Sequence, residues 1–156
     1  EEELATLVKD SPHEGFMLFA GFECSSSKGD ILIYGLRPED VNEFPPGGDP
    51  EAMLAKAQLM GGVCVAAHPT RACIPFDERI LEMPFDGIEI QSVNLEPHEQ
   101  RLAKKLAENL GIPGTSSSDS HRLEDIGAYS MEFDVPIQGM SDLLSAIKSG
   151  KFRTVA

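Results

Sequence analysis

The chain has 156 residues, of which 41% are hydrophobic, and it carries a formal net charge of −13. This length and composition predict a single soluble domain over residues 1–156 and exclude a disordered chain. The negative charge argues against broad electrostatic binding of DNA or RNA, while contacts with phosphates through bound metals stay open. No apolar run approaches the ~20 residues that cross a bilayer, and residues 1–10 lack the pattern of a signal peptide. We therefore expect a cytoplasmic protein that does not bind membranes.

The first half of the chain predicts a hairpin followed by a helix. Residues 15–23 form an apolar run of strand length, and residues 30–36 form another after the turn-rich segment SSSKG. A helix then begins at Pro50 with Asp49 as its N-cap and ends before Gly61. The nearly continuous apolar run over residues 62–69 is typical of a parallel strand that is covered on both faces.

The second half continues the alternation of strands and helices. Residues 87–93 predict a strand, and residues 95–111 predict a helix that ends at Gly111, with one apolar stripe at helical spacing: Leu102, Ala103, Leu106, Ala107 and Leu110. Residues 112–121 and 128–135 predict two short strands. The last helix has Ser141 as its N-cap and ends at Gly150. This order predicts an α/β fold with parallel strands and right-handed crossovers.

The three cysteines form no CxxC pair, which sets aside a zinc site of that type. Cys24 and Cys64 lie in apolar runs, whereas Cys73 does not. We expect buried free thiols in a reducing compartment rather than disulfides.

Residues that commonly bind metals gather at the ends of three predicted strands: Glu23, His68, and the pair Asp119 and His121. In parallel α/β folds, ligands bind at the carboxyl ends of the strands. These side chains offer oxygen and nitrogen donors, which suit Zn²⁺, Mn²⁺ or Fe. If the strand continued through residue 121, alternation would point Asp119 and His121 to the same side.

Each of these residues could also have an ordinary structural role. His68 can be a core histidine, Glu23 a solvated strand end, and Asp119 a turn cap. The metal-site interpretation is favoured because the alternative requires several independent coincidences, one ordinary role for each residue. The sequence lacks a GxSxG elbow, a P-loop and a GxGxxG motif, so it carries none of those catalytic or nucleotide-binding signatures.

Four motifs in this order resemble the PHP (polymerase and histidinol phosphatase) superfamily of metal-dependent phosphoesterases: GFEC at 21–24, GGVCVAAHPTR at 61–71, GIEI at 87–90 and SDSH at 118–121. The resemblance implies a distorted (β/α)7 barrel, similar to a TIM barrel, with two or three metals at its C-terminal face. It also implies that Glu23 bridges two metals, that His68 is the His-Pro ligand, and that Asp119 and His121 are the final ligands. Arg71 would stand where a cation can hold a substrate phosphate.

The chain departs from the family at its beginning. The His-x-His strand and the Thr-Asp-His strand of the family are missing, and residues 1–10 resemble the helix that follows them. His13 fits neither motif, while Asp30 is a weak substitute for a histidine found there in some members. We therefore expect a partial α/β barrel without its first βα units. It would be a fragment of a longer protein, or its open edge would be covered by a partner subunit or a second copy.

The leading functional hypothesis is a metal-dependent phosphoesterase in which metal-bound hydroxide attacks a phosphorylated small molecule or a nucleotide. Ser117, Ser118 and Gln91 are candidates to orient the histidine ligands. One alternative is a catalytically inactive remnant that acts as a binding or scaffold subunit, because the His-x-His motif is missing. Another is a metal hydrolase that acts on C–N bonds.

Overall fold

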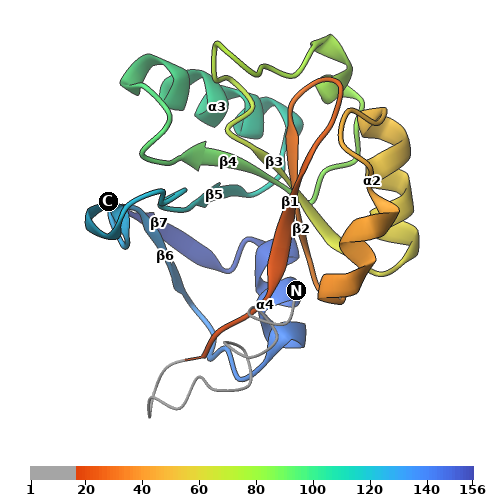
Figure 1. Ribbon diagram of the computed structural model, residues 1–156. Coiled ribbons are helices and arrows are strands. Elements are labelled where there is room, and N and C mark those ends of the chain that lie inside the picture. The colour runs from red at the N-terminus through yellow and green to blue at the C-terminus, as the bar shows by residue number, and fades with distance from the viewer. Residues whose placement is uncertain (1–16) are drawn as a thin grey trace.

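A computed structural model describes residues 17–156, and a mixed five-stranded sheet forms its centre (Figure 1). The strands lie in the order β1-β2-β3-β4-β5, with these bounds: β1 Gly21–Ser25, β2 Asp30–Tyr34, β3 Val63–Ala67, β4 Gly87–Gln91 and β5 Gly114–Ser116. The pairs β1/β2 and β2/β3 are antiparallel, and the pairs β3/β4 and β4/β5 are parallel. The predicted α/β class and the hairpin of the first two strands are confirmed, and the parallel part of the sheet consists of β3, β4 and β5. Over residues 17–156 the sheet does not close into a barrel, and the partial barrel stays a prediction.

The first strand differs from the one predicted over residues 15–23. Residues 15 and 16 lie outside the described part, Met17 and Leu18 are exposed, and β1 begins only at Gly21. It continues past Glu23 to Ser25, because the hairpin closes where Ser25 pairs with Asp30. Glu23 therefore lies in the middle of β1, opposite Leu32, and does not end the strand.

Helices cover both faces of the sheet. The structure has α2 at Pro50–Leu59, α3 at Pro97–Leu110 and α4 at Met140–Ser149, with short 3₁₀ helices η1 at Pro38–Glu43, η2 at Glu78–Leu81 and η3 at Leu123–Asp125. Buried residues of α2 and α3 pack with Cys64 and Ala66 of β3, whereas α4 packs on Val63 and Val65, which point to the opposite face. The prediction of a β3 covered on both faces is confirmed, and Figure 1 shows α3 and α4 on opposite sides of the strands.

Helix ends follow the predicted signals in most places. The Asp49 carboxylate accepts a hydrogen bond from the Ala52 amide at 3.0 Å, and Gly111 and Gly150 end their helices with left-handed backbone. The N-cap of α4 is Gly139 and not Ser141, because the helix already begins at Met140. Leu102 was wrongly placed on the buried stripe of α3: it is 52% exposed, while the alanines of the stripe are buried.

The predicted strand over residues 128–135 does not join the main sheet. It forms β6 (Ser130–Phe133), which pairs antiparallel with β7 (Phe152–Val155), a strand that the sequence did not reveal. Phe133 and Phe152 stack edge to face across this pair, with their ring centroids 5.8 Å apart. The partner strand lies beyond α4 in the chain, so local alternation could not indicate the pairing.

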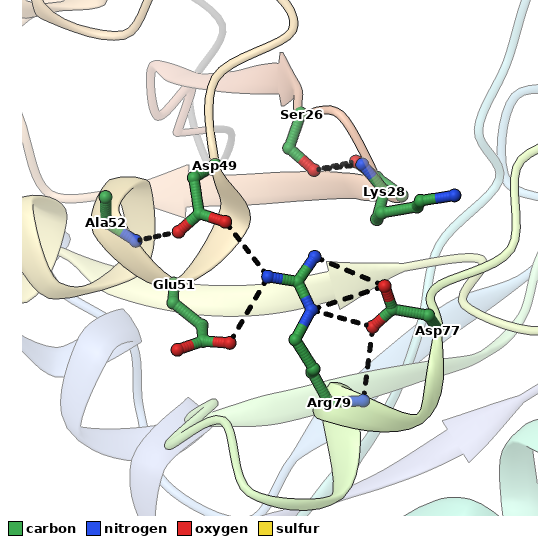
Figure 2. A network of polar contacts seen from close by, with 8 residues as sticks. Ser26, Lys28, Asp49, Glu51, Ala52, Asp77 and Arg79 are labelled. Atoms are coloured by element: carbon green, nitrogen blue, oxygen red, sulfur yellow. Dashed lines mark hydrogen bonds and ion pairs between the residues drawn. The ribbon is translucent and has the colours of Figure 1, made fainter.

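A network of ion pairs fastens η2 to the start of α2 (Figure 2). The Arg79 guanidinium binds both carboxylate oxygens of Asp77 and lies 3.0 Å from an oxygen of Asp49. It also lies 3.4 Å from Glu51, so three carboxylates share one cation. The loop between β3 and β4 is thereby held against α2. We call Arg79 and these three carboxylates the Arg79 cluster.

Cys24 and Cys64 are buried free thiols, as predicted, and Cys73 is an exposed one. Burial raises the pKa of Cys64 to about 12 and that of Cys24 to about 11. Both stay protonated at neutral pH and pack as small apolar groups. Among the described residues, none of the helices has the length and apolar character that crossing a membrane requires.

Candidate metal centre

The directions of the strands bring several carboxylates to one edge of the sheet. Because β1, β3, β4 and β5 point the same way and β2 runs against them, their carboxyl ends meet the amino end of β2 there. A cavity of about 110 Å³ opens at this edge, on the face of the sheet opposite α2 and α3. Its lining consists of Glu23, Leu32, Tyr34, Ala67, His68, Glu89, Ser117 and Asp119.

His68 is at the centre of this cavity. It follows the last residue of β3, its backbone has a positive φ of 27°, and its side chain is 4% exposed. Nε2 of its imidazole lies 3.2 Å from Oε1 of Glu23 and 4.0 Å from Oδ2 of Asp30. Nδ1 is buried and has no hydrogen-bond partner among the residues described. Nδ1 of His68 is thus a buried polar atom without a hydrogen bond, which is uncommon in folded proteins.

Electrostatics favours the charged forms of His68 and Glu23 in the absence of a metal. The hydrogen bond from His68 lowers the pKa of Glu23 by more than burial raises it, with smaller contributions from the charges of His121 and Arg71. Burial lowers the pKa of His68, but the hydrogen bond to Glu23 and the charges of Glu89, Glu23 and Asp119 outweigh it, so the pKa is raised. A negative field surrounds the ring and stabilises positive charge in this cavity.

Glu89 is a member of the site that sequence reasoning missed. It lies inside β4, is 2% exposed, and accepts hydrogen bonds from the His68 amide at 2.9 Å and from the Ser117 hydroxyl at 2.5 Å. Burial raises its pKa in spite of these bonds. The segment GIEI already pointed to Glu89. A carboxylate between two isoleucines of a buried strand is costly unless it has hydrogen-bond or charge partners.

Asp119 and His121 do not follow the strand alternation that was predicted for them. The strand ends at Ser116, and Asp119 has a positive φ of 47°. The Asn94 side-chain amide donates to Oδ2 of Asp119 at 2.6 Å and to its carbonyl at 3.0 Å, which fixes the carboxylate at the cavity. The side chain of His121 is 76% exposed and lies outside the cavity lining, with Nδ1 3.8 Å from Oδ1 of Asp119.

The loop after His68 carries Arg71 and is clasped by the first turn of α3. A carboxylate oxygen of Glu99, a residue 5% exposed, accepts a hydrogen bond from the Ala72 amide at 2.7 Å. The hydroxyl of Thr70 donates to the carbonyl of Glu99 at 2.8 Å. Arg71 itself is partly exposed and lies close enough to the cavity to lower the pKa of Glu23, after the larger effects of His68 and His121.

Ser117, Ser118 and Gln91 do not orient the imidazole of His68. Ser117 donates to Glu89, and Ser118 donates to the carbonyl of Tyr129 at 3.1 Å. Gln91 lines a different hollow of the surface. The prediction that one of them binds the second ring nitrogen of His68 is therefore wrong, because Nδ1 has no hydrogen-bond partner among the residues described.

The donors present fit a divalent metal ion. One donor atom each from Glu23, Asp30 and His68 can be chosen so that all lie within 4.8 Å of one another. Two donors that each lie about 2.1 Å from one ion are separated by about 3–4 Å. The separations of Nε2 of His68 from Glu23 and Asp30 agree with this geometry, and a set of one imidazole with carboxylates suits Zn²⁺, Mn²⁺ or Fe.

Comparisons with known proteins support the resemblance seen in the sequence. Residues 97–152 match the family model described as PHP-associated. A crystal structure of PsfC from Pseudomonas syringae PB-5123 superposes with a TM-score of 0.75 at 19% identity, covering 92% of this chain and 68% of that one. At this identity the likeness concerns the fold alone, and no curated protein matches the chain. The match over residues 97–152 supports the resemblance to the PHP superfamily, and it covers about a third of the chain.

Proposed function

We propose that this chain is part of a metal-dependent phosphoesterase and that its reaction takes place at the cavity around His68. The observation that carries the proposal is the grouping of Glu23, Asp30 and His68, from three neighbouring strands, beside the carboxylates of Glu89 and Asp119. Four carboxylates face a single imidazole in a confined space. Such a site has a deficit of positive charge that a divalent ion would offset.

The residues of the chain would divide the work as follows. Glu23, His68 and Asp119 are proposed ligands, with Asp30 as a further one, and His121 would join them by turning from its exposed position. Glu89 fixes the backbone at His68 through the amide hydrogen bond. Arg71, on the loop that Glu99 clasps, would bind a phosphate oxygen of the substrate. The bound ion would make water a stronger nucleophile at neutral pH and offset charge on the phosphoryl group.

The same proposal includes the finer points of the fold. Residues 1–156 would form one domain that corresponds to the C-terminal portion of a distorted (β/α)7 barrel, with β1 at its open edge. Further ligands would come from a preceding segment or from a partner subunit that covers this edge. The substrate would be a phosphorylated small molecule or a nucleotide, because the net charge of −13 disfavours broad nucleic-acid binding.

Metal binding and turnover test this proposal separately. Zn²⁺ or Mn²⁺ is soaked into crystals, and anomalous scattering is expected within about 3 Å of the donors of Glu23, His68 and Asp119, a generous margin on ligand distances. In solution, the imidazole NMR signals of His68 and His121 should move with added Zn²⁺, while exposed His98 serves as the internal control. Anomalous peaks placed only elsewhere would remove the metal assignment.

Turnover is measured with p-nitrophenyl phosphate and bis-p-nitrophenyl phosphate, in the presence of Mn²⁺ and with His68→Ala as the matched variant. Hydrolysis that depends on both the metal and His68 is expected, and faster cleavage of an amide substrate would favour C–N chemistry instead. The chain is assayed alone and with the segment that precedes it in its gene, because further ligands are part of the proposal.

A binding or scaffold role is the second candidate, and one observation favours it. Among the residues described, His68 is the single histidine that lines the cavity, and its Nε2 already has a partner 3.2 Å away, Oε1 of Glu23. A site of this kind can persist without metal. Metal binding without turnover, in every arrangement of the assay above, would select this role over catalysis.

A further inference from the structure

A second cavity, of about 330 Å³, lies where the first two turns of α3 meet the end of β4 and the strand β7. It shares no lining residue with the cavity around His68. Its volume is at the lower end of the about 300–1,000 Å³ typical of small-molecule sites. We call it the α3 cavity.

The charge of this lining is opposite to that of the chain. Asp and Glu outnumber Lys and Arg by 26 to 13, yet the charged residues that line the cavity are Arg101 and Lys104, without any carboxylate. Across residues 17–156, six Lys and Arg side chains form ion pairs with carboxylates: Arg37, Lys56, Arg79, Arg122, Lys148 and Arg153. Arg101 and Lys104 form none, and the same holds for Lys28, Arg71, Lys105 and Lys151, which do not line the cavity. Both cations thus keep their charge available to a ligand.

Their positions on the helix are unfavourable when nothing is bound. Arg101 and Lys104 are three residues apart, so their like charges are neighbours on one face of α3. A bound anion would relieve this repulsion.

The rest of the lining supplies fixed polar and apolar contacts. The side-chain amide of Gln100 donates to the Leu95 carbonyl at 3.0 Å and to the Tyr129 hydroxyl at 3.2 Å, which holds this wall of the cavity in place. The hydroxyl of Thr154 stands on β7, while Ile90 and Pro97 provide apolar surface. A ligand would therefore combine an anionic group with a small apolar part.

We propose that the α3 cavity binds a small organic molecule through an oxyanion, a phosphate or a carboxylate, held by Arg101 and Lys104. The guanidinium offers a planar fork for two oxygens, and the ammonium adds a mobile point charge. Binding here is independent of the metal centre and does not require the proposed phosphoesterase activity.

The test is an NMR titration of the isotope-labelled chain in low salt with a chelator, so that phosphate has no metal to bind. Inorganic phosphate and succinate are the two probes, and the tighter one identifies the oxyanion that the site prefers. We expect saturable shifts at Arg101, Lys104 and Thr154 that weaken as salt is raised. Arg101→Gln with Lys104→Gln should weaken binding about tenfold or more, because two charge-assisted contacts are lost.

Two matched variants test whether the anion binds in the α3 cavity itself. Lys105→Gln removes an exposed charge of the same helix that does not line the cavity and should leave binding unchanged. His68→Ala removes the centre of the other cavity and should leave it unchanged as well. The proposal is overturned if the double variant binds as the wild type does, if the shifts centre on His68 and Asp119, or if neither probe gives a saturable change.

Discussion

Two groups of carboxylates in this protein differ in the cation that each contains. In the Arg79 cluster, three carboxylates on partly exposed side chains surround a guanidinium that reaches all of them (Figure 2). Around His68, the three carboxylates of Glu23, Glu89 and Asp119 line a confined cavity, and the only cation of the lining is one imidazole. A guanidinium offers five donors, whereas an imidazolium offers two.

This difference separates a structural cluster from a candidate binding site. In the Arg79 cluster each of the three carboxylates lies within 3.4 Å of the guanidinium and is 36–54% exposed, so water also solvates the excess negative charge. The cavity around His68 is confined, its Glu89 is only 2% exposed, and a buried ring nitrogen has no partner among the residues described. Excess negative charge that is shielded from water is a better guide to a metal site than the number of acidic residues.

His68→Ala should have the largest effect, a loss of Zn²⁺ affinity of more than about 100-fold, because even partners of metal ligands are worth about 10–100-fold. Calorimetric titration measures it. The control is Asp77→Asn in the Arg79 cluster, which should leave the affinity unchanged. Equal losses in the two variants would mean that both clusters hold the ion.

Glu89→Ala should lower the free energy of unfolding by about 1–3 kcal/mol in the absence of metal, because the buried amide of His68 loses its acceptor. Urea unfolding measures this change. Glu89→Gln should restore most of the stability, since its carbonyl can accept from His68 and its amide can donate to Ser117. A full loss in Glu89→Gln would show that the charge of Glu89, and not the hydrogen bond, holds the cavity together.

The metal-free chain should lose stability as the pH rises above 6.5, the ordinary pKa of histidine. The pKa of His68 is raised on folding, so its contribution is complete below 6.5 and disappears as the pH rises through the higher folded value. The pKa of Glu23 is lowered from 4.5, so its contribution is present above 4.5 and is lost as the pH falls through the lower folded value. Unfolding free energies across this range should show a flatter profile in Glu23→Gln, and an identical profile would refute the charged pair.

Arg79→Met should have the smallest effect, a modest fall in the thermal midpoint with unchanged Zn²⁺ affinity. The three carboxylates then repel one another, but they are solvated and can move apart. Arg79→Lys keeps the positive charge but loses the planar guanidinium with its several donors. Its thermal midpoint should lie between those of Arg79→Met and the wild type. A decrease in metal affinity would contradict the division between the two clusters.

Sequence reasoning was most successful where a local signal decides the structure. The Asp49 cap, Gly111 and the apolar run of β3 predicted their elements because each depends on neighbouring residues. The motifs also indicated Glu23, His68 and Asp119, which line one cavity. Whether they bind a metal stays a prediction.

What the sequence did not reveal depends on contacts between distant segments. Glu89 becomes part of the site only because β3 and β4 are adjacent and bring it to the His68 amide. The pairing of β6 with β7 spans α4, and the left-handed backbone at Asp119 is stabilised by Asn94 from another loop. No local pattern of residues contains these relations.

The clasp of Glu99 on the loop after His68 bears on how this chain can be divided. Glu99 belongs to the segment that matches the PHP-associated family model, whereas Thr70 and Ala72 precede that segment. A cut between the two, for expression or for transplantation into another scaffold, would expose a buried carboxylate and free the loop that carries Arg71. The limits of the family match are therefore not the limits of an independent building block, and the two parts should be exchanged between relatives only together.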